Sequence, residues 1–352
     1  MQQCKLPLMF YKQKDFRQIK ITICLLWNGI CLTRFQTNHF NYMKILVYAK
    51  LEKEMQSELE KHLPDDAEVL FASDISEQEV KEAWQSAEVL IGNPPADWFE
   101  ETPGALKFWQ LENVGFEQYK EVDYKGKTAN VGDISAVPCA ETIVSGILAF
   151  YRGIPKMVRN QVKKEWVGEK SSAGLQILSG KKVIILGSGA IGEHVNKLLQ
   201  AFGCSTQMTA KSDPQAEIHS FDHLLQQLTE TDLVVNTLPG NLDKYVSQEF
   251  FDAMKEGSLY ANVGRGNTTD EAALINALES GKLTGAVLDV TEKEPLAEDS
   301  PLWEMENVIL TQHTGAEHAG RDQDKVEKFI SNIRKYLNHE EIEDEVKLSE
   351  GY

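Results

Sequence analysis

Short apolar runs alternate with amphipathic stretches along the chain from Met43 onward. Residues Met43–Ala49 predict a strand, and residues Leu51–His62 predict a helix, because Leu51, Met55 and Leu59 recur on one helical face. The same alternation predicts further strands over 67–71, 87–91 and 106–111, with a helix over 77–85. Strands that alternate with helices are typical of a parallel sheet covered by helices.

A second series of strands starts after a long interruption. Pro138 precedes a helical stretch over Ala140–Tyr151, and a polar segment then runs to Gly180. Buried strands are predicted, with helices between them, over residues 182–186, 205–210, 232–238, 258–263, 286–290 and 307–311. We therefore expect two α/β units, with the second inserted in the first.

The best-marked helix of the second unit is expected over 270–280. Thr268 and Glu271 have the spacing of a capping box, Leu274 and Leu278 face the core, and Gly281 ends the helix. The chain from Glu317 onward is predicted to form a helix that returns to the first unit.

Residues 1–42 differ from the rest of the chain in charge and pattern. They carry a single acid, Asp15, against six basic residues, whereas the whole chain has a formal charge of −18. Three interpretations compete: a secretory signal, an ordered extension, or a mis-assigned start with the working protein beginning at Met43. Lys20, Trp27 and Asn28 interrupt the apolar stretch and no small-residue cleavage site follows, so the third interpretation is preferred.

Composition narrows the class of protein. A chain of 352 residues suits two domains, and no apolar run reaches the ~18 residues of a membrane-spanning helix. The charge of −18 disfavours nucleic acid and anionic membrane surfaces as partners. The five cysteines show no CxxC spacing, so we expect no metal site and a reducing cytoplasmic location.

The sharpest local motif is the glycine-rich segment Gly187–Gly192. Gly187, Gly189 and Gly192 follow the apolar strand 183–186 and open a helix, which is the context of a dinucleotide-binding loop. The glycines allow a tight turn, close approach of a pyrophosphate, and close packing of helix on strand. The helix N-terminus attracts the phosphates. A plain glycine turn or a methyltransferase loop are the alternatives.

The end of the second strand selects the cofactor. An acid about 20 residues after the glycines usually holds the ribose 2′-hydroxyl of NAD. Ala210 stands 18 residues after Gly192, where the acid is expected, and Lys211 and Ser212 follow it. Asp213 comes three positions after Ala210. A cation and a hydroxyl here favour the 2′-phosphate of NADP, with NAD possible, unless Lys211 is only a solvated surface lysine.

Polar residues stand at the ends of three other strands. Arg265 lies between Gly264 and Gly266, and Asp289 and His313 end later strands. Ligands of open parallel sheets bind outside the carboxyl ends of the strands, so these side chains should converge on the cofactor crevice. Glu294, on the loop after Asp289, can reach the same place. Each also has an ordinary explanation: a surface cation for Arg265, a core histidine for His313, and a solvated acid for Glu294.

The second unit resembles the D-isomer-specific 2-hydroxyacid dehydrogenases. The resemblance covers about residues 43–352 and leaves residues 1–42 out. It rests on Gly187–Gly192, Asn262–Gly266, Gly285–Val290, Glu294–Leu296, Pro301–Trp303 and Asn307–His313, in the family's order and spacing. It implies a Rossmann-type doubly wound parallel sheet plus a flavodoxin-like α/β substrate domain.

The resemblance also implies a role for each residue. Arg265 would bind the substrate carboxylate and carbonyl, with the backbone of Val114 and Gly115, and His313 would protonate the new alkoxide. Glu294 would pair with His313 and keep it cationic. The cofactor would be held by Gly187, Gly189, Ala190, Ile191, Gly192, Lys211, Ser212, Pro239 and Asp289. Hydride addition builds negative charge on oxygen, which explains the need for a proton donor and a cation.

The expected function is reduction of a small 2-oxo acid to the D-2-hydroxy acid with NAD(P)H. The alternative is a corepressor-like protein of the same fold that senses NAD(P). Departures from the family are Gln312 in place of a proline, Tyr245 in place of a threonine, and the missing acid at Ala210. The substrate side chain cannot be read from the sequence.

The resemblance also sets the expected domains. The substrate domain takes residues 43–139 and 317–352, and the NAD(P)-binding domain takes 140–316. Residues 140–180 are expected to form the contact of a homodimer.

Overall fold

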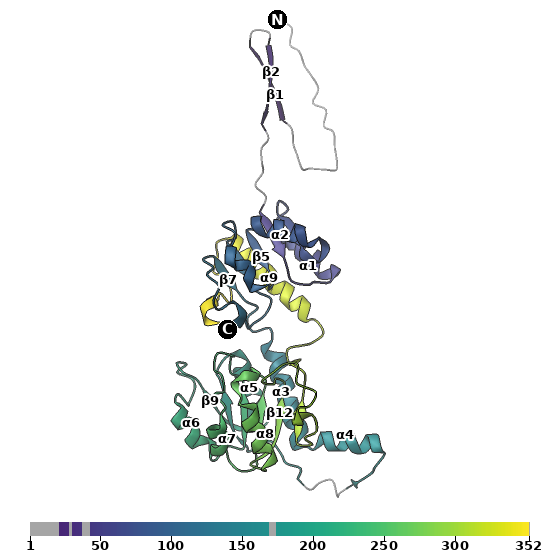
Figure 1. Ribbon diagram of the computed structural model, residues 1–352, viewed down its shortest axis with the longest axis vertical. Coiled ribbons are helices and arrows are strands. Elements are labelled where there is room, and N and C mark those ends of the chain that lie inside the picture. The colour runs from purple at the N-terminus through teal and green to yellow at the C-terminus, as the bar shows by residue number, and fades with distance from the viewer. Residues whose placement is uncertain (1–20, 28–29, 37–42, 169–173, 352) are drawn as a thin grey trace. The chain divides into compact units, whose positions relative to one another are not determined.

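A computed structural model describes residues 21–27, 30–36, 43–168 and 174–351 (Figure 1). The chain divides into two units, residues 1–43 and 44–352. In the first unit, β1 (Ile21–Trp27) pairs antiparallel with β2 (Ile30–Gln36), a strand pair that the sequence did not predict. The other residues of the expected leader lie outside the described residues, so its interpretation as a mis-assigned start stays a prediction.

The second unit begins with a parallel sheet of order β4-β3-β5-β6-β7. Its strands are β3 (Lys44–Val47), β4 (Glu68–Phe71), β5 (Val89–Ile91), β6 (Phe108–Gln110) and β7 (Lys127–Ala129). Its helices are α1 (Lys53–His62), α2 (Glu77–Ser86) and α9 (Arg321–Leu337). We call this sheet and these helices the first lobe. Its strand order is that of flavodoxin-like folds, as expected.

A six-stranded parallel sheet follows, of order β13-β12-β11-β10-β8-β9. Its strands are β8 (Lys182–Leu186), β9 (Ser205–Thr209), β10 (Leu233–Asn236), β11 (Ser258–Asn262), β12 (Leu283–Leu288) and β13 (Val308–Leu310). We call this sheet and its helices the second lobe. β9 lies on one side of β8, and β10 to β13 follow one another on the other side. The strand order therefore reverses between β8 and β10, and doubly wound sheets bind nucleotides at such a point.

Helices cover both faces of this sheet, because alternate residues of a strand point to opposite faces. Val183 and Ile185 of β8 pack in one core with α3 and α5, whereas Ile184 and Leu186 pack in another with α6, α7 and α8. The helices are α3 (Ala136–Tyr151), α4 (Ile154–Lys163), α5 (Ala190–Ala201), α6 (Phe221–Leu228), α7 (Gln248–Ala253) and α8 (Glu271–Glu279). The predicted α/β class with two parallel sheets is confirmed.

Short 3₁₀ segments complete the two lobes. They are η1 (Ala72–Asp74), η2 (Ala96–Glu101), η3 (Glu117–Tyr119), η5 (Gly266–Thr268), η6 (Pro301–Trp303) and η7 (Leu348–Glu350). Among the described residues, no helix combines the length and apolarity that a membrane crossing requires.

Several predicted boundaries were wrong. The cap of α8 is Asp270, whose carboxylate accepts a hydrogen bond from the Ala273 amide at 3.1 Å, and the Thr268 hydroxyl instead donates to the Arg265 carbonyl at 2.6 Å. Helix α3 starts at Ala136, four residues early, because Pro138 fits a first turn where no amide partner is needed. β9 and β13 are sheet edges and are only partly buried. β7 and α4 were not predicted.

The predicted tail helix is present, but α9 starts at Arg321, four residues after the predicted start at Glu317. α9 packs against α1 and β6 of the first lobe (Figure 1), and its Phe329 and Ile333 are fully buried. Asn332, also fully buried, donates to the Gln110 side-chain oxygen at 2.8 Å and accepts from the Glu343 amide at 3.1 Å. A buried polar group is stable only when it is hydrogen-bonded, so this amide pair fixes the register of α9 on the sheet.

Candidate active site

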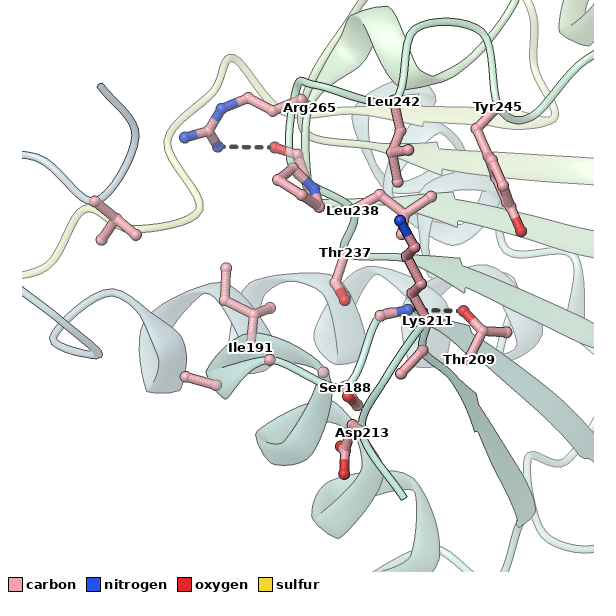
Figure 2. Close-up of a pocket in the computed structure, with 18 of the residues that line it drawn as sticks. Ser188, Ile191, Thr209, Lys211, Asp213, Thr237, Leu238, Leu242, Tyr245 and Arg265 are labelled. Carbon is pink, nitrogen blue, oxygen red and sulfur yellow. Dashed lines mark hydrogen bonds between the residues drawn. The ribbon is translucent and has the colours of Figure 1, made fainter. Parts of the chain in front are cut away.

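A cavity of about 660 Å³ opens at the carboxyl ends of β8 and β10, the switch point of the six-stranded sheet (Figure 2). The second lobe contributes residues 187–192, 209–213, 218–221, 237–239, 242, 245, 264 and 265 to its lining. The first lobe and the start of α3 contribute residues 114, 115, 117, 132, 133, 135 and 136. Its volume and mixed lining are those of a small-molecule site.

The glycine loop forms one wall, as predicted. Gly187 has φ +102°, and a Cβ on Gly192 would overlap the Gly187 carbonyl, so neither position accepts a side chain without strain. A Cβ on Gly189 would meet no atom within 4 Å, which leaves open space where a diphosphate could approach the backbone. Ala190 and Ile191 line the cavity at the start of α5. The loop therefore fits a dinucleotide.

The loop after β9 brings the expected ribose-binding residues to the same cavity. Ala210, Lys211 and Ser212 all line it. Asp213 lines it too, and hydrogen bonds from the Ser188 hydroxyl and the Gln215 amide hold the pKa of its carboxyl below the usual range. Asp213 is therefore ionised at neutral pH, and its side chain lies beside Ser188 of the glycine loop (Figure 2).

His219 also reaches this end of the cavity. Its Nδ1 lies 2.9 Å from the Ala210 carbonyl oxygen, and its ring is part of the cavity lining. His219 could not be identified from the sequence. It follows Ile218, which pairs with Thr209 of β9, but no strand ends near it in the sequence.

Arg265 closes the cavity on the side of the first lobe. Its Nη1 donates to the Gly264 carbonyl at 3.1 Å (Figure 2), and its Nε donates to a carboxylate oxygen of Glu117 at 3.1 Å. A Cβ on Gly115 would overlap Nη2, so the guanidinium lies directly against the Val114–Gly115 backbone. The structure thus brings together the three residues predicted to bind a carboxylate.

His313 and Glu294 form a pair on neighbouring loops. Nδ1 of His313 lies 2.6 Å from a carboxylate oxygen of Glu294, whose other oxygen accepts from the Thr291 amide at 3.1 Å. The His313 side chain is about half exposed, at 51%. Because Glu294 occupies Nδ1, the Nε2 atom is the one that can face a ligand. This pair was predicted, although neither residue is among the described lining of the cavity.

Asp289 is buried, and both oxygens of its carboxylate accept hydrogen bonds from other groups of the protein. One oxygen accepts from the Thr311 hydroxyl at 2.6 Å and the Thr314 amide at 3.1 Å, and the other accepts from the Gly315 amide at 3.0 Å. The Asp289 carbonyl accepts from the His313 amide at 2.7 Å. Asp289 therefore holds the loop that carries His313 in its left-handed conformation, φ +53°. Its predicted contact with a cofactor stays a prediction.

The chain also matches proteins of known family and structure. The sequence model described as "D-isomer specific 2-hydroxyacid dehydrogenase, NAD binding domain" matches residues 144–315. A D-specific alpha-keto acid dehydrogenase of Enterococcus faecium is 31% identical over 256 residues, which are 68% of this chain and 78% of that protein. The chain belongs to this family. As a member of the 2-hydroxyacid dehydrogenases, it is an oxidoreductase.

Two further proteins, one compared by sequence and one by structure, match most of this chain. Glyoxylate/hydroxypyruvate reductase B of Serratia proteamaculans is 28% identical over 287 residues, 77% of this chain and 87% of that protein. The structure of an NADPH-dependent glyoxylate/hydroxypyruvate reductase of Sinorhizobium meliloti, in complex with NADP and sulfate, superposes with a TM-score of 0.75. That alignment is 22% identical and covers 88% of this chain and all of the other, so it shows a shared fold.

Part of the lining of this dehydrogenase's cavity was predicted from the sequence. Pro239 lines it as predicted, and so does Tyr245, which was noted only as a departure from the family. The lining residues that were not predicted include Glu117, Asp133, Thr209, His219, Thr237 and Leu242. Thr209 and Thr237 could have been found, because they stand at or just past the ends of β9 and β10, where ligands of such sheets bind.

Proposed function

We propose that the protein reduces a small 2-oxo acid to the corresponding D-2-hydroxy acid with NADPH or NADH. The observation that carries the proposal is the His313–Glu294 pair, a proton donor with its carboxylate at 2.6 Å, on the same lobe as the glycine loop and Arg265. The names of the Serratia and Sinorhizobium relatives support a small 2-oxo acid as the substrate class.

In the proposed reaction, Arg265 and the backbone amides at Val114 and Gly115 bind the substrate carboxylate. The planar guanidinium suits two parallel hydrogen bonds to a carboxylate and holds the adjacent carbonyl. The reduced nicotinamide supplies the hydride for the carbonyl carbon. As negative charge develops on the carbonyl oxygen, Nε2 of His313 donates the proton, and the Glu294 carboxylate stabilises the imidazolium beforehand. One hydride and one proton thus convert the ketone into the alcohol.

Turnover by the purified protein tests this function against the corepressor-like alternative. The assay follows oxidation of NADPH and NADH with glyoxylate, hydroxypyruvate, pyruvate and bulkier 2-oxo acids, and a chiral separation identifies the product enantiomer. Nucleotide binding without reduction of any of these acids would favour the binding protein instead. An L-hydroxy acid as product would contradict the proposed stereochemistry.

We further propose that NADPH is the preferred cofactor. Ala210 can neither bind a 2′-hydroxyl nor repel a 2′-phosphate, and Lys211 and Ser212 line the cavity beside it. Asp213 is ionised, so it partly offsets the attraction of Lys211 for a phosphate. One exposed charge contact is worth about 1 kcal/mol or less, so the expected preference is roughly several-fold.

The substitution Ala210→Asp should move the preference toward NADH. The new carboxylate would accept hydrogen bonds from the ribose hydroxyls of NADH and repel the 2′-phosphate of NADPH. The measurement is kcat/KM for each cofactor in the native protein and in the variant. A native protein strongly selective for NADH would contradict the proposal and identify Asp213 as the ribose ligand.

We also propose the domain roles and the assembly. Residues 43–139 and 317–352 bind substrate, and residues 140–316 bind NAD(P), a range that contains the family match over 144–315. Helix α4 buries none of its residues, and Ile154, Val158 and Val162 form an exposed apolar stripe at helical spacing. Such a stripe supports a homodimer through 140–180, which light scattering of the purified protein would test.

Cys139 and Cys204 support the proposed cytoplasmic location. Both are free thiols, and burial raises the pKa of Cys139 to about 11.

A further inference from the structure

Glu117 places a carboxylate at the point where the substrate would be held. It is the first residue of η3, directly after the turn that carries Gly115, and it lines the cavity. One of its carboxylate oxygens accepts from Nε of Arg265 at 3.1 Å, and the other lies 2.9 Å from the site of a Cβ on Gly115. Its side chain is 41% exposed, so the carboxylate remains accessible from the cavity.

The charges on this side of the cavity are unbalanced. Among the described residues of the lining, the first lobe and the start of α3 contribute two acids, Glu117 and Asp133, and no base. The cation on this side is Arg265, from the second lobe, and Glu117 already pairs with it. Lys211, the other lysine or arginine of the described lining, comes from the loop after β9.

We propose that Glu117 is a specificity-determining residue that reads the substituents of the substrate side chain, from C3 outward. It disfavours 2-oxo acids with a second carboxylate and favours those whose C3 substituent donates a hydrogen bond. The proposal rests on the proposed function, because Arg265 must hold the substrate's own carboxylate for C3 to lie beside Glu117.

Electrostatics gives the reason for both preferences. The first carboxylate of the substrate shares the charge of Arg265 with Glu117, which leaves no second cation on this side for another anion. A like charge placed next to Glu117 lowers the affinity for the wrong substrate. A hydroxyl on C3 can instead donate to the carboxylate, and a hydrogen bond to an ionised acceptor is about twice as strong as one between neutral groups.

Two matched pairs of substrates test the proposal in the native protein and in Glu117→Gln. The first pair is 2-oxopentanoate and 2-oxoglutarate, which differ by the second carboxylate. The second pair is hydroxypyruvate and 2-oxobutyrate, which differ by a hydroxyl in place of a methyl. Glutamine keeps the size of the side chain and removes its charge. We expect kcat/KM for 2-oxoglutarate relative to 2-oxopentanoate to rise about tenfold, and the preference for hydroxypyruvate to fall several-fold.

The ratios distinguish specificity from positioning. If Glu117 only orients Arg265, all four acids lose kcat/KM by the same factor and both ratios stay at their native values, which would overturn the proposal. Glu121→Gln, an exposed acid outside the described lining, removes the same charge from the same segment and should leave both ratios unchanged. A native protein that reduces none of the four acids would count against the proposed function, whereas native turnover with unchanged ratios in Glu117→Gln would count against Glu117 alone.

Discussion

Replacing Arg265 with lysine should lower kcat/KM for 2-oxo acids by about a hundredfold, with a higher KM and a lower kcat. Lysine keeps the positive charge but offers a point charge in place of a planar fork, so it cannot bind a carboxylate through two parallel hydrogen bonds. A lost hydrogen bond to a charged group costs about 1.5–3 kcal/mol, and misplacement of the carbonyl adds to the loss. Steady-state kinetics with hydroxypyruvate and NADPH measures the effect.

The structure adds a second reason for this loss. Arg265 uses Nη1 for the Gly264 carbonyl and Nε for Glu117, so two of its nitrogens are held and together fix the plane of its guanidinium. One ammonium cannot satisfy both contacts and also bind substrate in a fixed orientation. Arg334→Lys, an exposed position on α9, is the matched control and should behave as the native protein. Near-native kinetics of Arg265→Lys would remove Arg265 from the site.

Replacing Glu294 with glutamine should make the enzyme lose activity at lower pH. Reduction needs the protonated imidazole of His313, so activity falls as rising pH removes that proton. A carboxylate at 2.6 Å favours the charged imidazole, and an amide does not. We expect the falling limb of kcat/KM against pH to move to lower pH in the variant, with less activity on that limb.

The shape of the pH profile is the decisive measurement. At pH values below the limb the variant and the native protein should approach each other, because the imidazole is protonated in both. Glu298→Gln removes an exposed acid a few residues along the same loop and should leave the profile unchanged. An unmoved limb in Glu294→Gln would show that Glu294 is not the partner that matters for proton donation.

Much of the fold could be predicted because hydrophobic periodicity reports burial directly. The run Val183–Leu186 is apolar at every position because both faces of β8 are covered, and it matches the observed strand closely. The glycine loop was predictable for a similar reason, since its backbone conformation and its contact with α5 exclude side chains. Arg265 and His313 followed from their places at strand ends, and Glu294 followed from its place on the loop after Asp289.

What could not be predicted depends on contacts between distant segments. Both Thr268 and Asp270 are acceptable caps for α8, but the Thr268 oxygen already accepts from the Asn236 side-chain amide at 2.8 Å and its hydroxyl donates to the Arg265 carbonyl. The role of Asp289 in holding the His313 loop depends on three donors that come more than 20 residues later. Glu117 could not be recognised from the sequence, because its place in the site depends on its hydrogen bond with Arg265, which is 148 residues away.

The return of α9 to the first lobe has a consequence for the order in which the protein folds during synthesis. The β-sheet of the first lobe is complete in the nascent chain once Ala129 has emerged. The helix that covers it, and that donates to the Gln110 side-chain oxygen, arrives only with Phe329, Asn332 and Ile333. The nucleotide-binding sheet, which ends at Leu310, can close first. The half of the enzyme that is made first is therefore the half that matures last, and until then it carries an unpaired amide oxygen at Gln110 and an uncovered apolar face.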